Sequence, residues 1–199
     1  MAFHIILASG SQIRAELLRR ANVPIDVIKP RIDEDSIKAA LIAESAGPRD
    51  VADCLAEMKA RKISDSHPDT LVLGCDQVLD FRKSLLSKPK DQQDCIGQLA
   101  ELRGHTHQLC SAAVICENGQ PIWRHVGVAR LRMRDLSDDY IQSYVSRNWD
   151  SIRHSVGGYK LEEEGVRLFS SVQGDFFHVL GLPLLEILSY LALRGDLET

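Results

Sequence analysis

The first eighteen residues constrain the fold most, because they join a short apolar stretch to an amphipathic segment. Residues 4–8 predict a buried strand and residues 11–21 predict a helix, with a turn of small residues between them. A strand that runs into a helix presents free backbone N–H groups and the positive end of the helix dipole. This turn therefore predicts a phosphate site, and Arg14 adds a guanidinium suited to the same ligand. Alternatively, Ser9 or Ser11 simply caps the helix.

The bulk properties narrow the class of protein. A chain of 199 residues fits one domain, 1–199, in two lobes, and the net charge of −4 argues against nucleic-acid or membrane-surface partners. No apolar run is long enough to span a membrane and no leader is apparent, so the expected compartment is the cytoplasm. The five cysteines form no Cys-x-x-Cys pair and are expected to be reduced and mostly buried. The spacing of His105, His107, Cys110 and Cys116 fits no standard zinc module.

The order of predicted elements favours an α/β fold with a mixed central sheet. Strands are predicted at 4–8, 25–30, 71–79, 106–117 and 121–134, and helices at 11–21, 36–45, 49–65, 91–102, 138–147 and 182–193. Asn118-Gly119 predicts a tight hairpin between the two long strands. Ser137 is the expected cap of its helix, and Gly195 ends the last one. Phe176 and Phe177 are expected in the core.

Two charged residues fall where apolar side chains are expected. Asp76 interrupts the apolar strand 71–79, and a buried carboxylate needs a partner, a proton or a metal. It is either a metal ligand or base, or a residue that caps a turn at the strand end. Lys59 lies on the buried stripe of the helix 49–65, where it must either extend to solvent or meet an anion.

Further charges could serve the same ligand. Lys88 precedes a proline, which holds its backbone extended, and the loop 157–165 places three glutamates between glycines. An acidic run follows at 33–35. A nucleoside triphosphate needs cations for its phosphates and usually Mg²⁺ held by one or two carboxylates. The candidate cations are Arg14, Lys59 and Lys88.

The order of these motifs resembles the Maf family of septum-formation proteins, regarded as nucleoside triphosphate pyrophosphatases. The resemblance covers nearly the whole chain. Its motifs are Leu7-Ala8-Ser9 with Ser11 and Arg14, Asp33-Glu34, Lys59-Ala60, Gly74-Cys75-Asp76-Gln77-Val78, Lys88-Pro89, Leu102-x-Gly104-x-x-His107 and Gly181-Leu182-Pro183-Leu184. It implies an elongated mixed sheet flanked by helices, an inosine-triphosphatase-like fold with two lobes and a cleft.

The resemblance also implies the chemistry. A nucleoside triphosphate would be cleaved between its α and β phosphates, giving a nucleoside monophosphate and pyrophosphate. Asp76 would accept the proton of the attacking water and, with Glu34, bind a divalent cation, Mg²⁺ or Mn²⁺. Arg14, Lys59 and Lys88 would neutralise the phosphates, and Ser9 and Ser11 would line the phosphate turn. The resemblance implies a homodimer too.

Three positions bear on the base. Where the dTTP- and UTP-cleaving branch has arginine, threonine and glutamine, this chain has Ile13, Gln77 and Glu162. Gln77 and Glu162 resemble the branch that acts on 7-methylguanosine triphosphate. A carboxylate at Glu162 can accept two N–H groups of guanine, which uracil lacks. Ile13 departs from that branch, which tends to carry an aromatic residue there.

Three functions are therefore weighed. The leading hypothesis is a pyrophosphatase that removes modified or excess nucleotides, with guanine-like bases favoured. The second is the dTTP/UTP pyrophosphatase. The third is a nucleotide-binding regulator of septum formation without relevant catalysis, which the set of Asp76, Lys59 and Lys88 disfavours.

Overall fold

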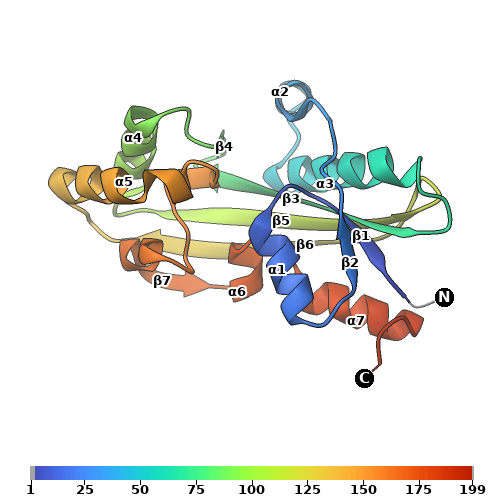
Figure 1. The fold of residues 1–199 in the computed structure, drawn as a ribbon. Coiled ribbons are helices and arrows are strands. Elements are labelled where there is room, and N and C mark those ends of the chain that lie inside the picture. Colours follow the sequence, from blue (N-terminus) through green and yellow to red (C-terminus); the bar gives the residue numbers. More distant parts are fainter. Residues whose placement is uncertain (1–2, 199) are drawn as a thin grey trace. The chain divides into compact units, whose positions relative to one another are not determined.

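A computed structural model of the protein describes residues 3–198. Its central feature is a seven-stranded mixed sheet (Figure 1). The strand order is β2-β1-β3-β5-β6-β7, and β4 pairs with β3 outside that path. The strands are β1 Ile5–Ala8, β2 Ile25–Val27, β3 Leu71–Phe81, β4 Ser84–Leu86, β5 Thr106–Glu117, β6 Gln120–Met133 and β7 Phe169–Gln173. The helices are α1 Gln12–Arg20, α2 Glu34–Ala43, α3 Pro48–Ser64, α4 Gln92–Leu102, α5 Asp138–Ile152, α6 Phe176–Val179 and α7 Leu184–Arg194, with short 3₁₀ turns at Val156–Gly158 and Glu164–Leu168. The predicted mixed α/β fold is confirmed.

The chain divides into two compact units, which are described separately. The first unit comprises residues 1–77, 111–127 and 181–199, and the second comprises 78–110 and 128–180. Strands β3, β5 and β6 contribute residues to both units.

In the first unit, parallel pairing positions the turn between β1 and α1. β1 pairs in parallel with β2 and with β3, and Ala8 lies opposite Gly74. The turn after β1 is therefore level with the residues that follow Gly74. Figure 1 shows α2 and α3 over one face of these strands and α1 and α7 over the other. Covered faces explain why β1 is apolar at every position.

The second unit has its own core beneath two helices that pack together, α4 and α5. Leu99 and Leu102 of α4 and Tyr144 of α5 are fully buried there. The N-terminus of α5 is formed as predicted, because the Ser137 hydroxyl accepts a hydrogen bond from the Tyr140 N–H at 3.2 Å. The Asn118-Gly119 turn, with positive φ at both residues, also joins β5 and β6 as predicted.

Some elements differ from the sequence prediction. The helix expected over 138–147 continues to Ile152, and the short strands β4 and β7 were not predicted. The expectation that Phe176 lies in the core is wrong: it is 48% exposed. Four cysteines are buried, Cys54 is half-buried, and all five are free, which confirms the expectation for them. Among residues 3–198, no helix is long and apolar enough to cross a membrane.

Candidate active site

Asp76 lies on β3 two residues after Gly74, where this strand packs closely against α3. A Cβ on Gly74 would lie 2.1 Å from the Ala56 carbonyl oxygen and 2.7 Å from the Ala60 backbone nitrogen. Only glycine allows the strand to approach the helix this closely. Side chains two residues apart share a face of a strand, so Asp76 faces α3 as well.

The ammonium group of Lys59 joins two carboxylates. Its Nζ donates to Asp76 Oδ1 at 2.5 Å and lies 3.1 Å from Glu34 Oε1. Lys59 and Asp76 are each 7% exposed, whereas the Glu34 side chain is half exposed. Lys59 therefore does not extend to solvent but contacts anions, and these anions are carboxylates of the protein itself.

Burial dominates the electrostatics of Asp76. The loss of water raises the pKa of its carboxyl above the usual range, and the positive charges of Lys59 and Arg14 act in the opposite direction. A carboxylate with a raised pKa is a better proton acceptor than an exposed one. Asp76 is therefore suited to take a proton from water.

Arg14 on α1 is held by two backbone carbonyl oxygens, one of which belongs to Cys75, the residue before Asp76 on β3. Its Nε donates to the Gly181 carbonyl at 2.7 Å, and its Nη1 donates to the Cys75 carbonyl at 2.8 Å. Gly181 has a φ of +86°, and a Cβ there would approach Arg14 Nη2 to 3.1 Å. The late glycine motif thus fixes the early arginine, a link between residues far apart in the sequence.

The turn between β1 and α1 joins a strand to a helix, as the sequence predicts. Ser11 is at the N-cap of α1 with extended backbone, but its side chain makes no capping hydrogen bond. Instead, the Ser9 hydroxyl accepts from the Ser11 N–H at 3.2 Å and from Arg14 Nη1 at 3.4 Å. Ser9 is buried, while Ser11 and Ile13 are half-buried. Simple side-chain capping therefore does not account for Ser11.

Sequence reasoning missed Lys38. It lies one helical turn after Glu34 on α2, and it is half-buried. Burial lowers the pKa of its ammonium, while the negative charges of Asp76 and Asp35 act against that shift. The i, i+4 spacing from Glu34 could have indicated Lys38 in the sequence. However, no residue of α2 is fully buried, so this helix shows no buried stripe on which a lysine would be conspicuous.

The predicted residues do not all converge. Gln77 follows Asp76 on β3 and so points to the opposite face, where its Nε2 donates to Ser111 Oγ at 2.9 Å. Lys88 and Glu162 belong to the second unit, and both are exposed. Lys88 follows β4, with the next residue, Pro89, buried.

The donor set of the first unit fits a hard divalent cation. Asp76 and Glu34 come from different elements, yet an oxygen of each contacts the same Lys59 ammonium. Carboxylate oxygens are what Mg²⁺ and Mn²⁺ prefer, and the exposure of Glu34 leaves room for the waters that Mg²⁺ retains. Lys59 now occupies the position between them, so a cation there would compete with or displace its ammonium group.

These features define an α/β protein in which a strand-to-helix turn and a buried carboxylate lie in one unit, and comparison with known proteins gives its family. A family model described as Maf-like protein matches residues 4–193. A protein of Ruegeria pomeroyi named nucleoside triphosphate pyrophosphatase is 66% identical over 199 residues, all of both chains. One of the same name from Roseobacter denitrificans is 68% identical over 193 residues, 97% of each chain. A Brucella abortus protein named 7-methyl-GTP pyrophosphatase is 40% identical over 191 residues, 96% of each chain. The chain belongs to the Maf family.

Proposed function

We propose that this protein hydrolyses a nucleoside triphosphate between its α and β phosphates, releasing a nucleoside monophosphate and pyrophosphate. The enzyme class predicted from the sequence, a nucleoside triphosphate pyrophosphatase and hence a hydrolase, is confirmed by relatives at 66% and 68% identity that carry this name. The observation that carries the proposed mechanism is the buried contact of Lys59 with Asp76, bridged to Glu34.

Asp76 is the proposed proton acceptor. Water attacks the α-phosphorus as its proton passes to the Asp76 carboxylate, and the bond to the bridging oxygen breaks. Pyrophosphate leaves with the electron pair of that bond. The raised pKa of Asp76 supports this role, because a weakly acidic carboxyl holds the transferred proton more readily.

Cations and backbone N–H groups bind the phosphates in this proposal. The triphosphate would meet the turn at Ser9 and Ser11, where the start of α1 favours negative charge. Arg14 is held in place by two backbone carbonyls, so it is ordered before any ligand binds. Lys59 and Lys88 would neutralise charge that develops in the transition state.

A divalent cation, Mg²⁺ or Mn²⁺, is proposed to bind at Asp76 and Glu34. Pyrophosphatases of this family typically depend on a metal, which when bound neutralises phosphate charge and polarises the reacting phosphate. The carboxylates that meet at Lys59 fit this ion. Binding would also free the Lys59 ammonium from its carboxylate partners to approach a phosphate oxygen.

Guanine and 7-methylguanine are the proposed bases, with Glu162 as their acceptor and Ile13 and Gln77 as further contacts. Glu162 is exposed and makes no hydrogen bond or ion pair to any other residue of the range 3–198. Its carboxylate is thus available for a bidentate contact. The name of the Brucella abortus relative supports the same base.

Pyrophosphate release with Mg²⁺ tests the reaction. Asp76→Asn should lose at least about 100-fold in kcat while the protein stays folded, since the proton acceptor is removed. Asp80→Asn, a change of the same kind farther along β3, is the matched control and should keep its activity. Normal turnover by Asp76→Asn would refute the mechanism, and release of inorganic phosphate instead would refute the site of cleavage.

A panel of methylated, canonical and deaminated triphosphates tests the base. Preference for 7-methyl-GTP or GTP that is lost in Glu162→Gln would support the assignment. Preference for dTTP or UTP would replace it with the pyrimidine alternative. Nucleotide binding without release of pyrophosphate would favour the regulatory alternative.

A further inference from the structure

We propose that α5 is the scaffold that presents Glu162: Arg147, Asn148 and Ser151 bind the two neighbouring glutamates and leave Glu162 alone to contact the base. This inference rests on the proposed role of Glu162. Arg147, Asn148 and Ser151 are positioning residues, because none of them is placed in contact with the substrate.

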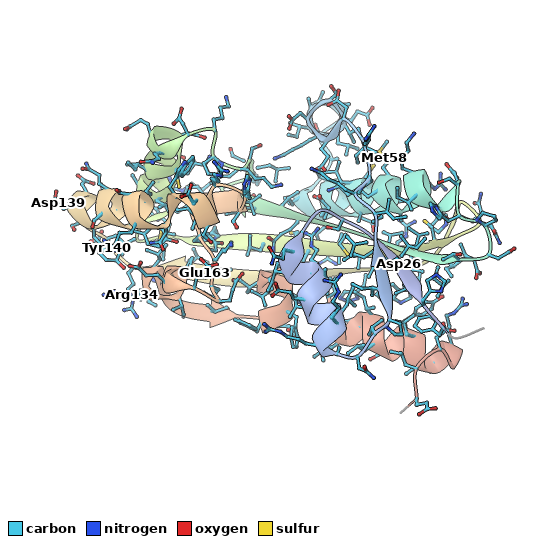
Figure 2. The ribbon with its side chains drawn as sticks, viewed as in Figure 1. Asp26, Met58, Arg134, Asp139, Tyr140 and Glu163 are labelled. Carbon is cyan, nitrogen blue, oxygen red and sulfur yellow. The ribbon has the colours of Figure 1, made fainter. Side chains whose placement is uncertain are left out.

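The two glutamates after Glu162 are both engaged by α5. Glu164 accepts from Arg147 Nη2 at 2.7 Å and from Asn148 Nδ2 at 2.9 Å, one bond to each carboxylate oxygen. Glu163, labelled in Figure 2, accepts from Ser151 Oγ at 2.6 Å. These hydrogen bonds lower the pKa of both carboxyls, so both remain charged and bound at neutral pH.

The helix presents its three donors along one edge. Arg147 and Ser151 are four residues apart and Asn148 lies beside them, so all three face the loop. Asn148 is itself fixed, because its Nδ2 also donates to the Tyr144 carbonyl at 2.9 Å. Tyr144 is fully buried, so these contacts tie the loop to the rigid part of the second unit.

Contacts within the loop and at its start also fix its conformation. Lys160 Nζ donates to Ser151 Oγ at 2.7 Å and to Glu163 Oε1 at 3.1 Å. A Cβ on Gly165 would lie 2.4 Å from the Lys160 carbonyl oxygen, so the chain folds back on itself too closely for any other residue. Leu161 is buried immediately before Glu162. Glu162 is therefore exposed on a loop that is fixed before and after it.

A fixed carboxylate discriminates better than a mobile one. A bidentate contact to two N–H groups requires both oxygens to be held in one plane and direction, and ordering a free loop on binding would cost affinity. Loosening α5 from the loop should therefore weaken binding of guanine substrates and leave the cleavage step unchanged.

A charge exchange tests this. Arg147→Glu places a carboxylate against Glu164, and Glu164→Arg places a third guanidinium group beside those of Arg147 and Arg167. The double variant restores an opposite-charge pair between positions 147 and 164. The probes are 7-methyl-GTP, GTP and UTP, and the readout is the ratio of kcat/KM for guanine over uracil substrates. Arg103→Glu is the matched control, because Arg103 forms an ion pair with Asp138 at the other end of α5, away from the loop. Thermal unfolding shows that each variant is folded.

We expect each single variant to lower the ratio about tenfold, through KM of the guanine substrates, and the double variant to recover most of it. Arg103→Glu should keep the wild-type ratio. An unchanged ratio in both single variants, with Glu162→Gln lowering it, would overturn the scaffold role and leave the base assignment intact. An unchanged ratio in Glu162→Gln would overturn both, whereas the loss of turnover in Asp76→Asn reports separately on the reaction.

Discussion

His107 should make the stability of this protein depend on pH between neutrality and pH 4. Its ring is 1% exposed on β5, and its Nε2 lies 2.7 Å from the Tyr159 hydroxyl. Its Nδ1 is buried and makes no hydrogen bond to any described residue. The charged ring would be out of contact with water, and its proton on Nδ1 would have no acceptor. Burial therefore lowers the pKa of His107 from 6.5 to about 4.

The magnitude follows from the two pKa values. Between about pH 6.5 and pH 4 the unfolded chain binds the proton and the folded chain does not, so the free energy of unfolding falls as the pH falls. The shift corresponds to about 3 kcal/mol in total, of which about 2 kcal/mol is lost between pH 7 and pH 5. The stability that the protein gains from keeping His107 neutral is fully present above pH 6.5 and absent below pH 4.

Urea unfolding at pH 7 and pH 5 measures this contribution. The glutamine of His107→Gln can keep a hydrogen bond to Tyr159 but cannot titrate. From pH 7 to pH 5, the free energy of unfolding of this variant should therefore fall by about 2 kcal/mol less than that of the wild type. The exposed His154, changed to Gln, should leave the wild-type pH dependence in place. Equal pH dependence in His107→Gln and wild type would refute the argument that the folded protein excludes this proton.

Three further predictions concern the first unit. In urea unfolding, Lys59→Met should lower the free energy of unfolding by about 3–5 kcal/mol, because it leaves the Asp76 carboxylate buried without its partner. Adding Asp76→Asn to this variant should restore much of the lost stability. Lys38→Met should lower kcat/KM for pyrophosphate release about threefold to tenfold by removing a positive charge near Asp76, whereas Lys62→Met, an exposed change on α3, should not. Gly74→Ala should lower the unfolding midpoint by the equivalent of about 1–3 kcal/mol or more, because its Cβ would overlap α3 backbone atoms.

Local patterns determined much of the fold. The apolar start, the Asn118-Gly119 turn and the Ser137 cap each depend on near neighbours in the chain, so the sequence contains the information needed to predict them. β7 was missed because it is held by contacts distant in sequence. It has four exposed residues of five and exists through its pairing with β6.

For the site, the sequence by itself determined which residues are anomalous: a carboxylate in an apolar strand and a lysine on a buried helical stripe. The periodicity of each element makes such misplaced charges visible. Only the tertiary structure decided that Lys59, Asp76 and Glu34 meet, that Gly181 holds Arg14, and that Lys38 is nearby. It also decided which glutamate of the late loop is unpaired, because the partners of the other two come mainly from α5. Contacts between distant segments depend on how the elements pack, and no local pattern records that.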